Sequence, residues 1–290
     1  MRQFLLVCSA VLALSSCLNE NDDQCLTLRF YIEDKHEAGD LHTRIGNDIQ
    51  LTVFRDGKVI KSLLIPHDAI HNGEYTFQKP EGTEGNVQFA AWGAHPDTPD
   101  LSRIYASVET GTKLEDMFLT RPPITRAATE WTELLPPVPH FRVVNAYVSD
   151  ARTYIDVPLT PAICRIRVRI YTSRESDDLS ALIEGTATQI NLLGEGIGNN
   201  YPVHTPMQRR TNNPRHYDTG IVPTLPSRND QTVSVVISDN GNEIIRLNEI
   251  DGQPITAKLG DYILFEYDED NLSVNISINE WETENEPSQM

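Results

Sequence analysis

Residues 164–170 read Cys-Arg-Ile-Arg-Val-Arg-Ile, a strict alternation of apolar and charged side chains. A period of two is the period of a β-strand that turns one face to a core and the other to solvent. A phosphate site is another use for a row such as Arg165, Arg167 and Arg169, but a solvated strand face explains the alternation more simply. The segment therefore predicts a half-buried β-strand.

The same period appears on both sides of this segment. Residues 26–32 alternate, residues 49–60 form two apolar runs around Asp56-Gly57, and residues 272–279 alternate again. Asp-Gly between two such runs is a strong hairpin signal. The segment 113–119 fits either a short helix or a strand. Many short strands with turns between them, and few helical patterns, predict an all-β protein built of β-sandwiches.

The length favours two such sandwiches in tandem. We expect a signal peptide at residues 1–16, an acidic tether at 17–24, an N-terminal β-sandwich at 25–155 and a C-terminal β-sandwich at 156–290. The chain that remains after the signal is long enough for two domains of ordinary size.

The first seventeen residues have the layout of a bacterial lipoprotein signal. Arg2 gives a positive start, Phe4–Leu14 is apolar, and Leu14-Ser15-Ser16-Cys17 has the ending of a lipobox. We expect acylated Cys17 to hold the chain to a membrane, since each buried methylene contributes about 0.8 kcal/mol. The alternatives are an ordinary signal peptide with a chance cysteine and a short membrane span. The apolar run is too short to cross about 30 Å of hydrocarbon, which disfavours the span.

The net charge of the chain limits the classes of partner that it is expected to bind. The full sequence holds 24 basic and 42 acidic residues. Residues 1–16 contain one base and no acid, so 23 basic and 42 acidic residues remain in the mature chain. Nucleic acid is therefore not an expected partner, because phosphates require lysine or arginine to neutralise them. The body of the protein should also avoid anionic lipid, which leaves the acyl chains as the membrane contact.

Two cysteines, Cys25 and Cys164, follow the lipidation site. Each stands near the start of a predicted strand, and in an oxidising compartment the two could form a disulfide. The alternative is two small buried residues in separate places. The sequence leaves both interpretations open.

The chain carries no recognisable catalytic motif, no cofactor motif and no convincing metal site. His67 and His71 have a helical i, i+4 spacing, but no third ligand lies beside them. The acidic run Asp268–Asn271 fits a hairpin turn better than a calcium loop, because it lacks the loop spacing and glycine. We therefore expect a protein that is not an enzyme.

The order of several strands resembles the FimB-type fimbrial anchor lipoproteins of Bacteroidetes. The segments that carry this resemblance are Cys25-Leu-Thr-Leu-Arg-Phe, residues 49–60, Gly73-Glu-Tyr-Thr-Phe, Val87-Gln-Phe-Ala-Ala-Trp-Gly and Ile244-Ile-Arg-Leu, with a last strand near Ile278-Asn-Glu-Trp281. Arg55 departs from the family pattern, which often has an acid before the turn.

The resemblance implies two transthyretin-like β-sandwiches and the role of a structural subunit. Family members tie a fibre to the outer membrane and help to limit its length. The implied partner is a fimbrial shaft subunit, joined by strand exchange, in which main-chain hydrogen bonds give affinity and alternating side chains set register. The implied location is the outer membrane at the cell surface, within the fimbrium.

The segment Leu272, Val274, Ile276 and Ile278 is the candidate for strand exchange. It is either the last strand of its own domain or a strand given to a neighbour. The residues beyond Trp281 are polar and too few to fill a groove, so we expect a terminal subunit rather than a shaft subunit. The alternative function is a surface lipoprotein that binds polysaccharide on a β-sandwich face without catalysis, which would require two or three exposed aromatic side chains.

Overall fold

The computed structural model describes residues 25–33, 41, 45, 48–93, 109–120, 140–211, 213–228 and 231–280. Almost all regular structure in these residues is β-strand, with 3-10 turns at His67–Ala69 and Leu114–Asp116. The predicted all-β class is confirmed. The expected signal at residues 1–16, the lipidation site Cys17 and the tether at 17–24 lie outside the described residues. No helix in the described ranges has the length and apolar character needed to cross a membrane.

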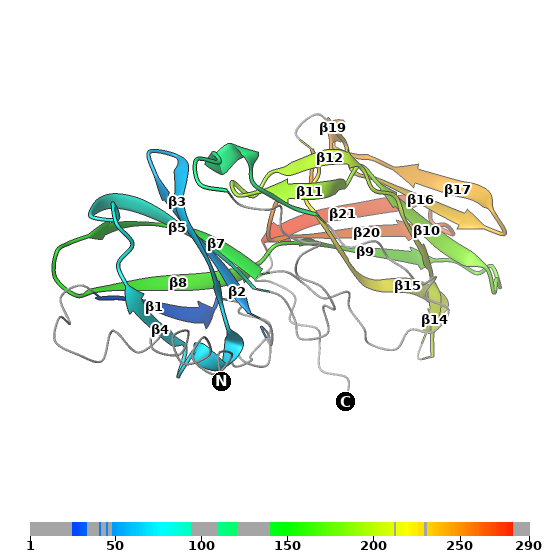
Figure 1. Ribbon diagram of the computed structural model, residues 1–290. Helices are drawn as coiled ribbons and strands as arrows, with labels where there is room; N and C mark the ends of the chain where they lie inside the picture. Colours follow the sequence, from blue (N-terminus) through cyan, green and yellow to red (C-terminus); the bar gives the residue numbers. More distant parts are fainter. Residues whose placement is uncertain are drawn as a thin grey trace, which may run out of the picture.

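The N-terminal lobe is a sandwich made from one sheet of order β3-β2-β5-β7-β8-β1-β4 (Figure 1). Side chains from both halves of this sheet share one apolar core, which includes Leu28, Leu51, Phe89 and Val157. The strands are β1 (Cys25–Ile32), β2 (Ile49–Arg55), β3 (Lys58–Ile65), β4 (Glu74–Gln78), β5 (Gly85–Gly93), β7 (His140–Val148) and β8 (Thr153–Pro161).

The C-terminal lobe packs a five-stranded sheet, β14-β15-β9-β20-β21, against a four-stranded sheet, β13-β10-β16-β17. Ile166 and Phe265 of the first sheet and Ile237 of the second lie in one buried core. The strands are β9 (Cys164–Tyr171), β10 (Leu179–Glu184), β13 (Val203–Pro206), β14 (Gln208–Arg210), β15 (Asn213–Thr224), β16 (Ser234–Asp239), β17 (Asn242–Leu247), β20 (Asp261–Asp268) and β21 (Ser273–Glu280); a two-stranded ribbon of β18 (Glu249–Ile250) and β19 (Gln253–Pro254) completes the lobe.

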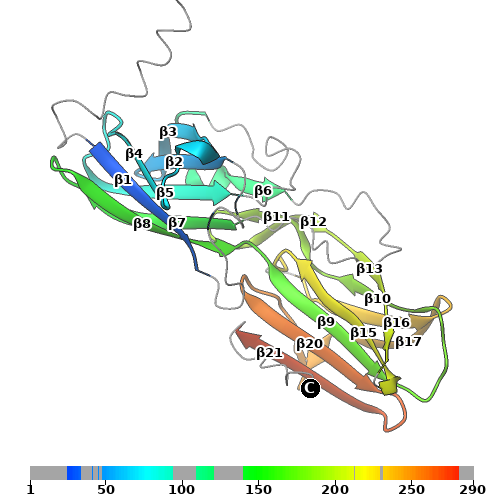
Figure 2. The same cartoon turned by 90° about the horizontal axis from the view of Figure 1, so that it is seen from below.

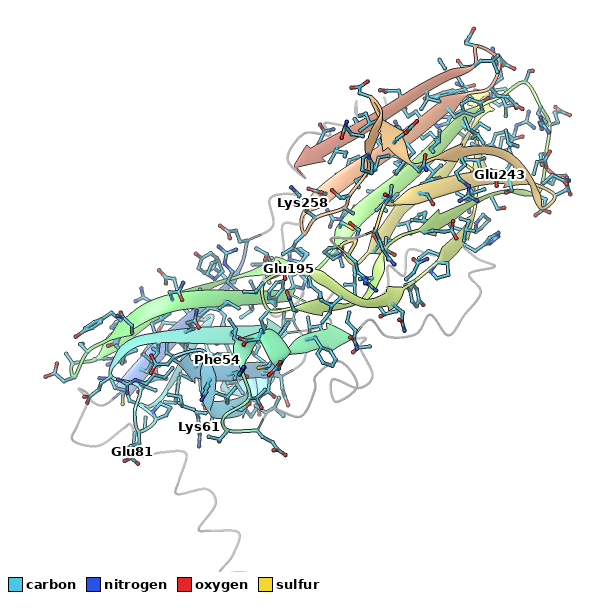
Figure 3. The ribbon with its side chains drawn as sticks, turned by 90° about the horizontal axis from the view of Figure 1, so that it is seen from above. Phe54, Lys61, Glu81, Glu195, Glu243 and Lys258 are labelled. Atoms are coloured by element: carbon cyan, nitrogen blue, oxygen red, sulfur yellow. The ribbon has the colours of Figure 1, made fainter. Side chains whose placement is uncertain are left out.

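The lobes lie end to end and are joined by more than the covalent chain (Figures 2 and 3). β6 (Phe118–Thr120) pairs with β11 (Ala187–Asn191), which also pairs with β12 (Gly196–Asn200). A separate buried cluster combines Trp92 and Phe141 of the first lobe with residues of the second. Figure 3 shows Glu195 where the two lobes meet.

The chain passes between the lobes at Ala162 and Ile163, the only residues between β8 and β9. The expected domain boundary between residues 155 and 156 instead falls inside β8. β8 continues to Pro161 because Thr160 and Pro161 pair with β7, which keeps the whole strand in the N-terminal sheet.

Of the two interpretations that the sequence leaves open for Cys25 and Cys164, the structure has the second: both are buried thiols in separate places, with no disulfide between them. They begin strands of different sheets, and Cys164 Sγ lies 2.9 Å from Thr224 Oγ1 instead. The expectation that the arginine row is a solvated strand face is wrong, because Arg165 and Arg167 are only 7% and 4% exposed.

Candidate groove between β7 and β8

The hairpin of β7 and β8 is splayed open along most of its length. Residues 149–152 connect the two strands, yet the strands pair only at the far end, where His140 faces Pro161 and Phe141 faces Thr160. Beyond that point each strand is paired along one side, β7 with β5 and β8 with β1. In the part of the chain that the structure describes, no strand occupies the space between them.

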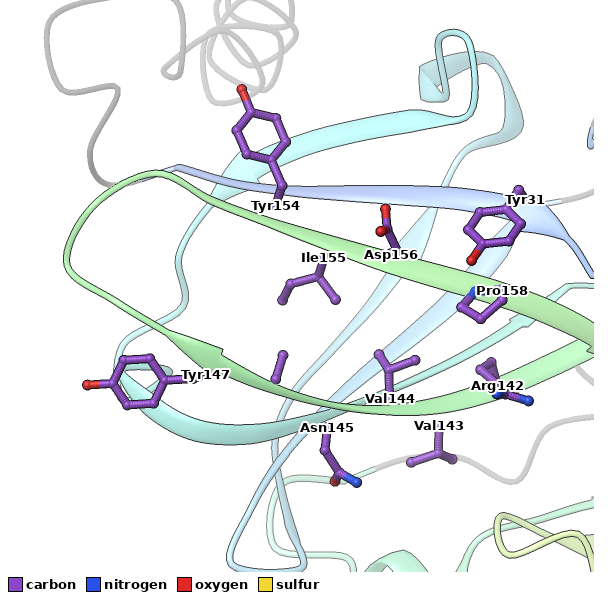
Figure 4. Close-up of a pocket in the computed structure, with 11 residues that line it drawn as sticks. Tyr31, Arg142, Val143, Val144, Asn145, Tyr147, Tyr154, Ile155, Asp156 and Pro158 are labelled. Carbon is purple, nitrogen blue, oxygen red and sulfur yellow. The ribbon is translucent and has the colours of Figure 1, made fainter.

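The space between the strands is a hollow of about 580 Å³ (Figure 4). Its floor is the margin of the N-terminal core, formed by half-buried Val144 and Ala146 from β7 and by buried Ile155 from β8. The alternation of each strand explains this floor, since every second side chain points into the sandwich. The core of this lobe is therefore open to solvent along one line.

The rim of the hollow is aromatic and polar. Tyr31, Tyr147 and Tyr154 are 46%, 69% and 48% exposed, and Asn145 and Asp156 stand between them (Figure 4). Four of these residues occupy outward positions of β7 and β8, whose inward positions form the floor, and Tyr31 lies on the neighbouring strand β1. The hollow thus has the amphipathic cross-section of a sandwich that lacks one strand.

A cation contact and an amide contact orient parts of this rim. The guanidinium of Arg29 lies 4.6 Å from the ring centroid of Tyr154, which is a cation–π contact. Gln88 Nε2 donates a hydrogen bond of 2.9 Å to Asn145 Oδ1. The rim side chains are therefore positioned by neighbours on strands that flank the hollow.

Both ends of the hollow are fastened. At one end, Lys79 Nζ donates hydrogen bonds of 2.5 to 3.0 Å to the carbonyls of Ser149, Asp150 and Ala151. At the other end, Arg142 Nη1 lies 3.9 Å from Glu33 Oε2 and Thr160 Oγ1 donates to the Phe141 carbonyl. These contacts hold the turn at one end of the hollow and the paired ends of β7 and β8 at the other.

The geometry suits the docking of an extended peptide. Residues 142–148 and 153–159 each present one side of a backbone without a ladder partner among the described residues. A segment of seven extended residues would span about 23 Å. Because β7 and β8 run in opposite directions, an inserted strand would be parallel to one edge and antiparallel to the other.

The candidate exchange segment lies elsewhere. Leu272, Val274, Ile276 and Ile278 belong to the β20–β21 hairpin, with β21 at the end of the five-stranded sheet. Ile276 is in the core, whereas the other three side chains are more than 40% exposed. The segment is thus the last strand of its own lobe in this structure, the first of the two alternatives.

A buried ion cluster accounts for the arginine row. Arg167 donates hydrogen bonds to the Asp218 carboxylate from Nε at 3.1 Å and from Nη2 at 2.8 Å. Arg210 donates a third at 2.9 Å. Arg169 Nε lies 3.5 Å from the same carboxylate. Burial alone would raise the pKa of the Asp218 carboxyl, but Arg167, Arg210 and the Gly220 amide outweigh it and lower that pKa to about 2.

The ring of His216 stacks on Tyr171 beside this cluster, with centroids 4.7 Å apart. Burial lowers the pKa of His216, and the nearby Asp218 charge opposes the change. Burial also raises the pKa of Tyr171. The described residues contain no group of three or more potential metal ligands. The arrangement of the cluster is that of a structural ion pair.

Sequence reasoning did not find the groove, although one signal for it exists. Pro158 stands inside β8, and proline has no N–H to donate to a ladder. Proline within a strand is confined to positions with an open side. Pro158 therefore marked β8 as a strand with a missing neighbour.

A family model of fimbrillin-A associated anchor proteins Mfa1 and Mfa2 matches residues 19–287. No curated protein sequence matches significantly. Among solved structures, the fimbrial anchor protein Mfa2 of Porphyromonas gingivalis has a TM-score of 0.55 at 14% identity, over 89% of this chain and 97% of that one. These values show a shared fold.

Two further structures share the fold. A protein of Bacteroides thetaiotaomicron, named as a candidate polysaccharide-binding protein, has a TM-score of 0.58 at 17% identity, over 89% of this chain and 96% of that one. The tip fimbrial protein Mfa3 of Porphyromonas gingivalis has a TM-score of 0.50 at 14% identity, over 89% and 99%.

Proposed function

This chain belongs to the family of fimbrillin-A associated anchor proteins, and we propose that it attaches a fimbrial fibre to the outer membrane by accepting a strand from a shaft subunit. The observation that carries the proposal is the splayed β7–β8 hairpin with its apolar floor. Main-chain groups of both edges would bind the incoming backbone, and alternate side chains would cover Val144, Ala146 and Ile155.

In this function the chain occupies a terminal position in the fibre. β21 remains paired with β20 along all eight residues, so the candidate exchange segment is in use within its own lobe. A subunit that accepts a strand without giving one would end the chain of exchanges and so help to limit fibre length.

Acylated Cys17 would supply the membrane attachment, with residues 18–24 as a polar tether. The support is the lipobox-like ending of the apolar run. Replacing Cys17 with alanine should release the protein from the membrane fraction of the cell. Retention of this variant in the membrane fraction would defeat the lipid assignment.

Strand acceptance is tested by placing a charge on the groove floor. Ala146→Glu would bury a carboxylate beneath the incoming strand, and we expect cells that carry this variant to shed their fibres into the medium. Leu64→Glu is the matched control, because Leu64 is an exposed apolar side chain on β3 outside the groove. Fibres retained by the Ala146→Glu cells as well as by the control cells would refute the groove as the acceptor.

A second candidate function is binding of polysaccharide without catalysis. The three exposed tyrosines of the groove rim favour it, since aromatic faces bind sugar rings. Glycan-array binding that is lost in a Tyr31→Ala, Tyr147→Ala double variant would support this function. If the protein bound no glycan on the array, the polysaccharide-binding function would be excluded and the anchor function would be unaffected.

A further inference from the structure

A second unpaired edge lies on the C-terminal lobe, on β21. β21 pairs with β20 over eight consecutive positions without a bulge, and it has no ladder partner on its other side among the described residues. Figure 2 shows it at the outer margin of the lobe, beside β20. A long and regular edge of this kind is a template for pairing with another chain.

The other edge strands carry the usual protection against such pairing, which is charge, proline or short length. The protected edges are β3 with Lys58 and Lys61, β4 with Glu74, β13 with Pro206, three-residue β14 with Arg209 and Arg210, and β17 with Glu243 and Arg246. The edge strands β6 and β12 are short, with three and five residues. β21 has no charged residue and no proline from Ser273 to Asn279. An unprotected edge of this length is open to pairing with another chain.

The side chains of β21 show what such a partner must provide. Ile276 belongs to the buried core, while its neighbours Val274 and Ile278 on the same face are 48% and 41% exposed. Leu272 extends the row at the turn and is 79% exposed. An added strand with alternating aliphatic residues would lie beside this row and extend the core. The opposite face carries serine and asparagine and would meet polar residues.

Charge distinguishes between the occupants that could fill this edge. The neutral stretch is bounded by the acidic turn Asp268–Asp270 at one end and by Glu280 at the other. Within the turn, Glu269 pairs with Arg174 and Asp270 pairs with Arg215, which leaves Asp268 as the carboxylate without an ion pair among the described residues. A second copy, antiparallel and centred on Ile276, would bring the Glu280 end of each chain toward the acidic turn of the other. Each chain also has a formal net charge of −18, which disfavours self-association.

We propose that the edge of β21 binds an extended segment of a different protein, with alternating aliphatic residues and with lysine or arginine at both ends. Backbone hydrogen bonds to β21 would hold the segment, its aliphatic side chains would cover Val274 and Ile278, and its basic ends would face the acidic boundaries. This site is separate from the β7–β8 groove, which lies in the other lobe, so either site can fail without the other.

The probe is a fluorescent peptide of alternating valine and threonine with a lysine pair at each end. Its binding to the full chain is measured by anisotropy, and its position by hydrogen exchange of residues 273–279. Val274→Lys and Ile278→Lys should each weaken binding by about tenfold or more, because an added strand would cover the new charge. Ser277→Lys is the matched control, since it adds the same charge on the polar face. Both replaced side chains are almost half exposed, so the variants should keep the wild-type circular dichroism and melting temperature.

Protection confined to β21, lost in the two apolar-row variants and kept in Ser277→Lys and in Ala146→Glu, would support the proposal. Equal binding of a peptide whose lysines are replaced by glutamates would overturn the basic-ended partner. Protection of β7 and β8 instead of β21 would overturn the site. A concentration-dependent dimer that Val274→Lys abolishes would show that the occupant is a second copy and would also overturn the proposal.

Discussion

Both lobes are β-sandwiches, but their cores differ in how far they are closed to solvent. In the N-terminal lobe the sheet parts between β7 and β8, and its core reaches solvent at Val144 and Ala146. In the C-terminal lobe the central strand β9 is paired on both sides, and one of its faces is held by the Arg167–Asp218 cluster. One lobe therefore has a gap in its sheet, which the proposed function fills with a strand of another chain, while the other lobe is complete between its edges.

The largest expected effect comes from breaking the ion cluster. Asp218→Ala would leave Arg167 buried without its partner, and we expect a loss of about 3–5 kcal/mol in the free energy of unfolding. Urea denaturation followed by tryptophan fluorescence and circular dichroism measures this loss. A loss below about 1 kcal/mol would mean that the cluster does not hold the C-terminal lobe together.

A matched pair of valines compares the two cores directly. Val168 on β9 is fully buried, whereas Val144 is half-buried on the groove floor. Val168→Ala should lower the free energy of unfolding by about 2.5 kcal/mol, because the removed methyl groups leave a cavity. Val144→Ala should cost less than about 1 kcal/mol, because water already reaches that site. Equal losses in the two variants would contradict the difference between the lobes.

The pH dependence of stability tests the cluster in a second way. The pKa of Asp218 falls from 3.8 to about 2 on folding, so its contribution is present above pH 3.8 and is lost as the pH falls toward 2. The contribution is about 2 kcal/mol, allowing for partial screening by solvent. Urea titrations of the wild type and of Asp218→Asn over this range measure it. The variant should show a flatter dependence, and parallel curves would argue against this assignment.

The smallest effect concerns the fastening of the groove. Lys79→Met would remove three hydrogen bonds to the turn at residues 149–152. Because the amine is partly solvated, we expect a loss of about 1 kcal/mol together with faster amide exchange in the turn. Unchanged exchange there would show that the turn holds its shape without Lys79.

Local pattern predicted the strands well, because a period of two in residues 164–170 or 272–279 depends only on neighbouring side chains. The Asp56-Gly57 hairpin and the turn between Tyr267 and Leu272 were predicted for the same reason. The partner of the arginine row could not be predicted in this way. Asp218 lies 51 residues from Arg167 and is aligned by a bulge between Asp218 and Ile221.

The groove was also beyond local pattern. Residues 149–152 connect β7 to β8 as in a hairpin, and it is the long-range pairing of each strand, with β5 and with β1, that keeps the two apart. Pro158 was the single residue that signalled an open side. The two cysteines were similarly ambiguous, because their separation depends on which sheets their strands join.

Hydrogen exchange at the groove tests the central claim most directly. Amide exchange of residues 142–148 and 153–159 is compared between the isolated protein and the same protein bound to its fibre. Strand acceptance predicts that these amides exchange much more slowly in the fibre-bound protein, whereas the fully paired amides of β9 stay unchanged. Identical exchange of the two edges in the free and fibre-bound protein would contradict the account.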